Sequence, residues 1–340
     1  MMMAPYLAIL FIGFSFVSSM LSSTMTTTMI INNEINSESS KRIVGGERAR
    51  IEQIPWQALI QQRISSFEND SSTIIQCGAV IIDPLWILSA GHCIHRPRQG
   101  ESYPIDVYFG VTEITPDIRQ SNVVRSVIRI FDPAKSDQRL SGDLILLQLN
   151  QSITISSKIQ PIRLPEMDDN FDYQIGVASG YGATFFQDPK TIKPINILHS
   201  VSVPILPKSS CLELYRKAFK DGATIAEDLI QKNKLICAGY RQGGSDACIG
   251  DSGGPLAVCV DDFWSSWRRR RRSNSMTRSS SSSNYLDKQC NGQWKLAGII
   301  SIGYRCAEPQ LPGLYIDLTV YSKWIQSIIM NNRLIDLKIN

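Results

Sequence analysis

The stretch Gly142-Asp143-Leu144-Ile145-Leu146-Leu147 places a short, wholly apolar run directly after a turn signal. Similar runs, many rich in β-branched residues, recur between turn residues along much of the chain. Short strands with few helical patterns between them are typical of an all-β sandwich or barrel. The expected strands lie within Gly78–Ile82, Trp86–Leu88, Val107–Phe109, Val123–Ile130, Leu144–Leu149, Val201–Ile205, Leu296–Ile302 and Leu314–Ile316.

The C-terminal part of the chain departs from this pattern. Thr319 is a suitable N-cap, and apolar residues then recur at helical spacing. We therefore expect a short amphipathic helix that packs on the body of the protein, with a membrane or partner-binding face as the less favoured alternative. Its apolar face comprises Val320, Trp324, Ile325, Ile328 and Ile329.

The composition excludes several classes of protein. With 43% hydrophobic and 19% charged residues, the 340-residue chain is too apolar for an intrinsically disordered protein. Its 22 glycines have no collagen period, and its 8 cysteines are too few for a scaffold built on disulfides alone. A hydrophobic core must therefore carry the fold.

The net charge of +4 is confined to one segment. Residues 260–289 hold seven Lys and Arg, including Arg268–Arg272, against three Asp, so the rest of the chain is neutral. A nucleic-acid-binding domain usually spreads its positive charge over a face, and we therefore expect no nucleic-acid partner. The Ser-rich remainder of this segment predicts a loop.

The N-terminus resembles a secretory signal. Residues 4–17 are apolar and are followed by small residues, a length that suits a signal peptide better than a membrane span, although no basic residue precedes the run. No later stretch is apolar enough to span a membrane. We expect a secreted, extracellular protein, in which the cysteines form disulfides and Asn69 and Asn150 are candidate glycosylation sites.

Three short words carry chemically useful side chains: Ser89-Ala90-Gly91-His92-Cys93, Gly142–Leu147 and Gly250-Asp251-Ser252-Gly253-Gly254-Pro255. In chain order they supply an imidazole, a carboxylate and a hydroxyl. A serine hydroxyl becomes a nucleophile when an imidazole accepts its proton, and a carboxylate fixes the tautomer of that imidazole. The glycines around the serine allow a sharp turn that points N–H groups at a developing oxyanion.

Each word alone also fits a plain structural role. His92 could be a buried histidine with satisfied hydrogen bonds, Asp143 could be a turn residue before a strand, and the segment around Ser252 could be a simple turn. The joint presence of all three in this order favours nucleophilic catalysis.

Together these words resemble the active-site motifs of trypsin-like serine proteases of the chymotrypsin family. Arg42-Ile43-Val44-Gly45-Gly46 resembles the activation site of that family, and the match extends from Ile43 to about Asn332. The resemblance implies two antiparallel β-barrels with a catalytic triad between them. It divides the chain into a signal peptide (1–19), a propeptide (20–42) and a peptidase domain (43–340) with a loop insertion at 260–289.

The resemblance implies three catalytic roles. His92 would be the general base, Asp143 would orient it, and Ser252 would be the nucleophile. The backbone N–H groups of Gly250 and Ser252 would form the oxyanion hole.

The same resemblance implies activation by proteolysis. Cleavage after Arg42 would create an ammonium group on Ile43, and Asp251 would receive it. A buried carboxylate requires a cation, which supplies a physical reason for this pairing.

Substrate specificity would depend on Asp246, Gly303 and Gly313. Asp246 occupies the position that lies at the floor of the primary specificity pocket in trypsin-like members, where a carboxylate favours Arg or Lys. The two glycines would keep the walls of that pocket open. The alternative is that Asp246 is simply solvated.

Eight cysteines alone leave the disulfide connectivity open. The resemblance implies Cys77–Cys93, Cys211–Cys237 and Cys248–Cys306. Cys259 and Cys290, which bracket the Arg/Ser-rich segment, are left as the fourth pair.

Three positions depart from the family pattern. Ile302 replaces a usual Trp, which removes an aromatic platform for substrate, and Arg305 replaces a usual Gly near the pocket entrance. Val111 stands where calcium-binding members carry a glutamate, so we expect no calcium site, no other metal and no cofactor.

The sequence thus predicts a secreted zymogen of a serine endopeptidase that cleaves after Arg or Lys. Its expected partners are protein or peptide substrates, an activating trypsin-like protease, protease inhibitors and anionic glycans that bind the Arg-rich loop. The alternative is a catalytically silent homologue that acts as a binding protein. The intact triad, activation site and pocket carboxylate favour the enzyme.

Overall fold

The computed structural model describes residues 45–65, 72–95, 103–121, 123–137, 142–183, 196–219, 227–232, 234–260, 290–303 and 306–339. All of them belong to the unit Ser40–Asn340. The signal peptide, the propeptide, Arg42, Ile43, Asn69, Arg305 and residues 261–289 of the insertion lie outside the described residues.

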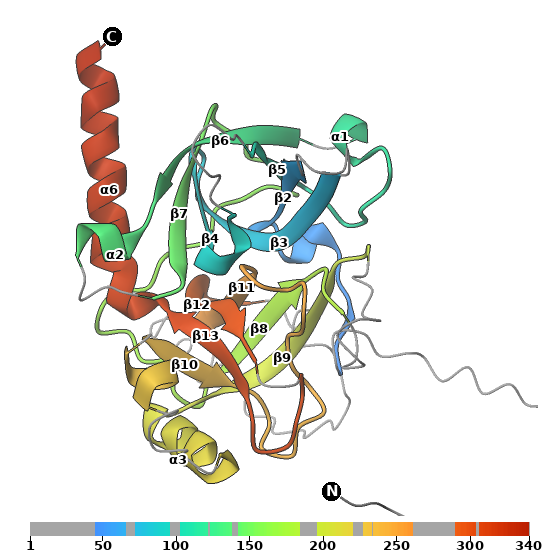
Figure 1. The fold of residues 1–340 in the computed structure, drawn as a ribbon, viewed down its shortest axis with the longest axis vertical. Coiled ribbons are helices and arrows are strands. Elements are labelled where there is room, and N and C mark those ends of the chain that lie inside the picture. Colours follow the sequence, from blue (N-terminus) through green and yellow to red (C-terminus); the bar gives the residue numbers. More distant parts are fainter. Residues whose placement is uncertain are drawn as a thin grey trace, which may run out of the picture. The chain divides into compact units, whose positions relative to one another are not determined.

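Twelve strands form two antiparallel barrels, as expected (Figure 1). The first barrel has the strand order β2-β3-β4-β7-β6-β5 and closes through pairing of β2 with β5. The second has the order β9-β10-β13-β12-β11-β8 and closes through pairing of β8 with β9. An additional strand, β1 (Glu47–Arg48), pairs with β9 at the edge of this barrel.

The strands of the first barrel are β2 (Gln57–Ser65), β3 (Ser72–Asp83), β4 (Trp86–Ala90), β5 (Ile105–Phe109), β6 (Val123–Phe131) and β7 (Leu144–Leu149). Those of the second are β8 (Ile175–Gly180), β9 (His199–Leu206), β10 (Leu235–Ala238), β11 (Pro255–Val260), β12 (Gln293–Ile302) and β13 (Gly313–Asp317). The described helical segments are η1 (Ile51–Gln53), η2 (Gly91–Cys93), α1 (Ile118–Ser121), α2 (Pro133–Ser136), α3 (Lys208–Ala218), the π-helix η4 (Glu227–Lys232) and α6 (Leu318–Ile339).

Strand β7 shows why an unbroken apolar run suits this fold. Ile145, Leu147 and Leu149 pack in a cluster of residues from the first barrel, whereas Leu144 and Leu146 belong to a larger cluster that includes residues of both barrels. Both faces of the strand are therefore buried, because alternate side chains point to opposite faces. This packing fixes the strand that follows Asp143.

The C-terminal helix α6 forms where expected but is longer than the sequence pattern indicated. Its cap is Asp317 rather than Thr319, because the Asp317 Oδ1 accepts hydrogen bonds from the backbone N–H of Thr319 (3.0 Å) and from its hydroxyl (2.6 Å). The helix packs with the buried Tyr321 and Ile325 against the core. Further along, Asn332 accepts a hydrogen bond of 2.8 Å from Arg129 of the first barrel.

Candidate active site

His92 and Asp143 are brought together by the pairing of strands β4 and β7. Ala90, the last residue of β4, pairs with Leu144, the first residue of β7, so the segments flanking these strands emerge side by side. The N–H of Gly91 donates a 2.5 Å hydrogen bond to the carbonyl oxygen of Asp143. His92 follows within η2 and therefore lies beside Asp143.

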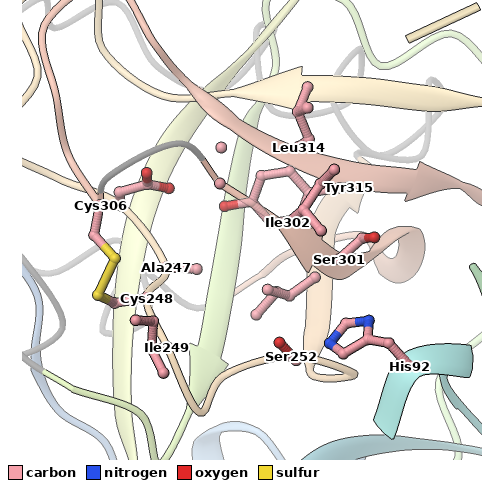
Figure 2. A pocket seen from close by; sticks show the side chains of 14 residues that line it. His92, Ala247, Cys248, Ile249, Ser252, Ser301, Ile302, Cys306, Leu314 and Tyr315 are labelled. Atoms are coloured by element: carbon pink, nitrogen blue, oxygen red, sulfur yellow. A yellow bond between two sulfur atoms is a disulfide. The ribbon is translucent and has the colours of Figure 1, made fainter. Parts of the chain in front are cut away.

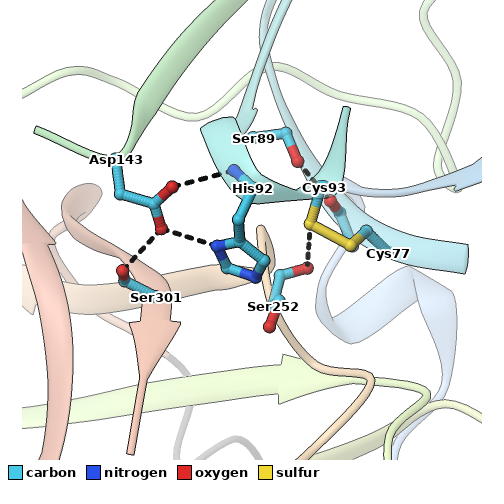
Figure 3. Close-up of polar contacts among 8 residues, drawn as sticks. Cys77, Ser89, His92, Cys93, Asp143, Ser252 and Ser301 are labelled. Atoms are coloured by element: carbon cyan, nitrogen blue, oxygen red, sulfur yellow. Dashed lines mark hydrogen bonds and ion pairs between the residues drawn. A yellow bond between two sulfur atoms is a disulfide. The ribbon is translucent and has the colours of Figure 1, made fainter. Parts of the chain in front are cut away.

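The side chains of His92 and Asp143 form a direct hydrogen-bonded pair (Figure 3). Nδ1 of His92 lies 2.7 Å from Oδ2 of Asp143, and the backbone N–H of His92 donates to Oδ1 at 2.9 Å. These contacts hold the imidazole with its other ring nitrogen directed away from the carboxylate. The Asp143 carboxylate accepts a hydrogen bond from Nδ1, so the neutral ring carries its proton on Nδ1. Nε2 is then free to accept a proton.

The pKa values of this pair move in opposite directions. The hydrogen bond to Asp143 raises the pKa of His92 above its ordinary value, although burial opposes the shift. Burial acts to raise the pKa of Asp143, but hydrogen bonds from His92 and from the Ser301 hydroxyl hold it below its usual value. Asp143 is therefore an ionised acceptor at neutral pH, and it stabilises a proton on His92.

Ser252 lies in the turn that precedes β11, and its side chain is next to the His92 ring in both close-up views (Figures 2 and 3). The turn requires glycine at two places: Gly250 has φ +96° and Gly253 has φ +82°. A side chain is disfavoured in this left-handed region. Among the described residues, the N–H groups of Gly250 and Ser252 donate no hydrogen bond, so both are available to an incoming acceptor.

A pocket of about 250 Å³ opens beside His92 and Ser252 (Figure 2). Its walls come from the segment before Ser252, from the end of β12 and from the start of β13. The lining residues are His92, Asp246, Ala247, Cys248, Ile249, Ser252, Ile300, Ser301, Ile302, Gly303, Cys306, Gly313, Leu314 and Tyr315.

Asp246 lines this apolar pocket and is only 2% exposed. Its Oδ2 accepts a 3.1 Å hydrogen bond from the N–H of Ala307, whereas Oδ1 has no partner in the described part of the chain. Burial raises the pKa of Asp246 to about 7, even though the N–H groups of Ala307 and Ala247 favour its ionised form. The alternative of a solvated Asp246 is therefore wrong.

The two pocket glycines differ in what a side chain would meet. A Cβ on Gly313 would lie 2.5 Å from Oδ1 of Asp246, which is closer than real contacts permit. A Cβ on Gly303 would meet no described atom within 4 Å. Glycine at 313 thus keeps space around the carboxylate, whereas a side chain at 303 would project into open space.

Asp251 is fully buried behind the Ser252 turn. Its Oδ1 accepts from the N–H of Gly182 at 2.7 Å and its Oδ2 accepts from the N–H of Cys248 at 2.9 Å. Burial raises the pKa of Asp251 to about 6, and these two N–H groups oppose the shift. None of the ion pairs among the described residues includes Asp251.

Four disulfides join Cys77 to Cys93, Cys211 to Cys237, Cys248 to Cys306, and Cys259 to Cys290. The first attaches η2, and hence the residue next to His92, to strand β3. The third joins two walls of the pocket, and the fourth closes the base of the insertion at 260–289.

Two contacts at the site had no signal in the sequence. The hydroxyl of Ser301 donates a 2.7 Å hydrogen bond to Oδ2 of Asp143, although the two residues are 158 positions apart. Ala307 adopts φ +59°, a conformation that few non-glycine residues adopt, and its N–H meets Asp246.

Three further positions named from the sequence lie in different surroundings. Asn150 is exposed at the end of β7, and Ile302 is 42% exposed at the pocket. Val111 is buried, and its carbonyl accepts a 2.7 Å hydrogen bond from the Tyr181 hydroxyl. Of the helices that the structure describes, none is long and apolar enough to cross a membrane.

Two antiparallel barrels with a paired His and Asp beside a serine turn define a chymotrypsin-like serine protease fold. The sequence model of the trypsin family matches residues 43–268, and the chain belongs to this family. The curated relative "Serine protease filzig" of Drosophila melanogaster is 28% identical over 297 residues, which cover 85% of this chain and 14% of that protein. The chain thus spans a small part of the length of this relative.

Proposed function

We propose that the chain is a secreted serine endopeptidase that hydrolyses peptide bonds after Arg or Lys. The observation that carries this proposal is the 2.7 Å contact of His92 with Asp143, beside Ser252 and a pocket lined by the buried Asp246. An intact arrangement of this kind favours the enzyme over a silent homologue acting as a binding protein.

The proposed reaction uses each of these residues at a defined step. Nε2 of His92 removes the proton from the Ser252 hydroxyl as the oxygen attacks the scissile carbonyl. The N–H groups of Gly250 and Ser252 donate to the resulting oxyanion. His92 then gives its proton to the leaving amine, and water hydrolyses the acyl-enzyme by the same route in reverse. Asp143 stabilises the imidazolium throughout.

The proposed preference for Arg and Lys follows from the state of Asp246. A cationic side chain supplies the donor that the unpartnered Oδ1 lacks, and it favours the ionised form of the carboxyl. An apolar side chain would leave a buried polar group unpaired. This costs about 1–3 kcal/mol for a neutral group and more for a charged one. Because about 1.4 kcal/mol is tenfold in rate, a cost of about 1–3 kcal/mol corresponds to discrimination of about fivefold to about 150-fold against an apolar side chain.

The proposed activation step follows from the state of Asp251. This carboxylate is fully buried, and among the described residues its partners are N–H groups rather than a cation. Cleavage after Arg42 by a trypsin-like protease would free the ammonium group of Ile43, which could pair with Asp251 and favour its ionised form. The zymogen would therefore be switched on by a new charge.

Secretion is proposed from the N-terminal signal and is supported by four disulfides, which persist in oxidising compartments. Extracellular protease inhibitors and anionic glycans are the further partners that the active site and the Arg-rich loop would meet.

The test compares the hydrolysis of peptidyl-Arg, peptidyl-Lys and peptidyl-Phe amides after activation with immobilised trypsin, which is removed before the assay. The proposal expects cleavage of the Arg and Lys substrates and little cleavage of the Phe substrate. Asp246→Asn is the matched control, because it keeps the shape of the side chain and removes the charge. Equal hydrolysis of all three substrates, or no hydrolysis of any, contradicts the proposal.

A further inference from the structure

Two consecutive residues of strand β3, Cys77 and Gly78, contact both halves of the proposed catalytic machinery. Cys77 is bonded through its disulfide to Cys93, the neighbour of His92 in η2. The N–H of Gly78 donates a 2.8 Å hydrogen bond to the carbonyl oxygen of Ser252. Two consecutive residues of the first barrel are thus attached to the segment that carries the base and to the residue that carries the nucleophile.

The contact between Gly78 and the serine turn leaves no room for a side chain. A Cβ on Gly78 would lie 2.7 Å from the backbone nitrogen of Gly254 and 2.8 Å from its Cα. A Cβ on Gly253 would in turn lie 2.2 Å from the carbonyl oxygen of Gly78. Both groups that would be displaced are backbone, so a substitution on either side must move the turn.

The carbonyl of Gly78 is held as firmly as its N–H. The hydroxyl of Ser89, a fully buried residue in β4, donates a 2.8 Å hydrogen bond to this carbonyl oxygen. Ser89 lies three residues before His92 in the same segment. The Ser89 hydroxyl therefore holds the Gly78–Ala79 peptide from the histidine side, and the preceding peptide, Cys77–Gly78, presents its N–H to the serine side.

We propose that Gly78 is a positioning residue for the proposed hydrolysis. By holding the Ser252 carbonyl while the adjacent disulfide holds the His92 segment, it sets the separation between the nucleophile and its base. This inference rests on the proposed function of Ser252 and His92. It assigns to Gly78 no contact with substrate, because the residue acts only through the serine turn.

The proposal predicts a loss of turnover without a loss of substrate binding. The pocket around Asp246 receives no atom from Gly78. Ser252 is one of several residues that line the pocket, whereas the charge that a bound cation meets there is that of Asp246. A displaced serine turn should therefore lower kcat much more than it weakens inhibition by the cation benzamidine. Misplacement of a reacting group by about 1 Å can cost about 100-fold in rate.

The experiment measures kcat, KM, the benzamidine inhibition constant and the melting temperature of the activated enzyme. The test variant Gly78→Ala is matched by Gly176→Ala, which would place a Cβ 2.6 Å from a Leu256 methyl group without touching the serine turn. We expect Gly78→Ala to lower kcat about 100-fold and to leave the benzamidine constant within about twofold. Gly176→Ala should lower the melting temperature while leaving kcat within about twofold.

A milder pair of variants decides the matter if Gly78→Ala does not fold. Ser89→Ala removes the hydroxyl that donates to the Gly78 carbonyl, and Ser179→Ala removes another fully buried hydroxyl, which donates to Gln57 at 2.7 Å. We expect Ser89→Ala alone to lower kcat, by about tenfold.

Two results would overturn the inference. One is an unchanged kcat in Gly78→Ala or, if that variant does not fold, in Ser89→Ala. The other is an equal loss of kcat in the corresponding control variant. In both cases the parent enzyme is active and the proposed function stands. A parent that remains inactive after activation would instead overturn the proposed function, and the inference with it.

Discussion

Acidification should weaken the binding of a cation in the pocket, because Asp246 must lose its proton to pair with one. The carboxyl is 2% exposed, and burial raises its pKa to about 7. Below that pH the neutral acid predominates, so the affinity for benzamidine should fall by about tenfold for each further pH unit. At pH 5 the loss is then about 100-fold, equivalent to about 2.7 kcal/mol.

Isothermal titration calorimetry in buffers of different ionisation enthalpy measures the proton that benzamidine displaces. From the pKa of about 7, binding should release about half a proton at pH 7 and about nine-tenths of a proton at pH 6. At pH 8 the release should fall to about one-tenth of a proton, because the carboxyl is already ionised.

His92 also lines the pocket and has a raised pKa, so its protonation would oppose a bound cation at low pH. The measurement therefore uses the variant His92→Gln, in which Asp246 titrates and position 92 does not. Asp246→Asn is the control that carries no charge at position 246. If His92→Gln bound benzamidine equally well at pH 5 and pH 8, with no proton release at pH 6, the assignment of Asp246 as the buried cation receptor would be refuted.

Three further predictions concern the other residues of the site. Asp143→Asn should lower kcat about 10⁴-fold, since the amide cannot hold the imidazolium and favours the wrong tautomer; steady-state hydrolysis of a peptidyl-Arg amide checks this, and a loss below about tenfold contradicts it. Gly313→Ala should raise the benzamidine dissociation constant by at least about tenfold, because its Cβ would lie 2.5 Å from Asp246 Oδ1; unchanged calorimetric affinity speaks against an open pocket at this point. Arg42→Gln should stay inactive after exposure to immobilised trypsin. The cleaved parent should lose activity at alkaline pH as the new ammonium group of Ile43 is deprotonated. Full activity in the uncut variant rules out the activation mechanism.

Short apolar runs between turn residues predicted an all-β sandwich or barrel, and the family resemblance implied two barrels. Strand β7 is the clearest case, because every residue from Leu144 to Leu149 is buried. Strand β2 was not predicted, since it begins with Gln57 and its apolar residues are interrupted at Gln62. Both glutamines are buried: the Gln57 side chain accepts a hydrogen bond from Ser179 and donates one to the carbonyl of the adjacent Ala58, and the Gln62 side chain donates to the carbonyl of the distant His95. Hydrogen bonds that offset the burial of a polar side chain depend on the tertiary structure, so they leave no pattern in the local sequence.

Helix α3 was missed for a related reason. Its sequence, Lys208–Ala218, is polar on average, and only Cys211, Leu212, Leu214 and Tyr215 are buried. The Cys211–Cys237 disulfide and the hydrogen bond of Tyr215 to the Pro312 carbonyl attach it to the second barrel. A helix stabilised by such long-range contacts has a weak signal in its own sequence.

The site was predictable where its residues form short words and was not predictable where it depends on contacts across the fold. His92, Asp143 and Ser252 stand out because each lies in a distinctive local motif. Ser301 and Gly78 do not stand out, because their roles appear only when β12 meets Asp143 and β3 meets the serine turn.

The central claim, that Ser252 is an activated nucleophile, is tested most directly by labelling with a serine-directed fluorophosphonate after cleavage at Arg42. The account predicts one labelled site, located at Ser252 by peptide mass spectrometry, in the activated parent. Labelling should be absent from Ser252→Ala and strongly reduced in His92→Ala. A correctly folded, cleaved parent that does not label, or a label on another residue that persists in Ser252→Ala, would contradict the claim.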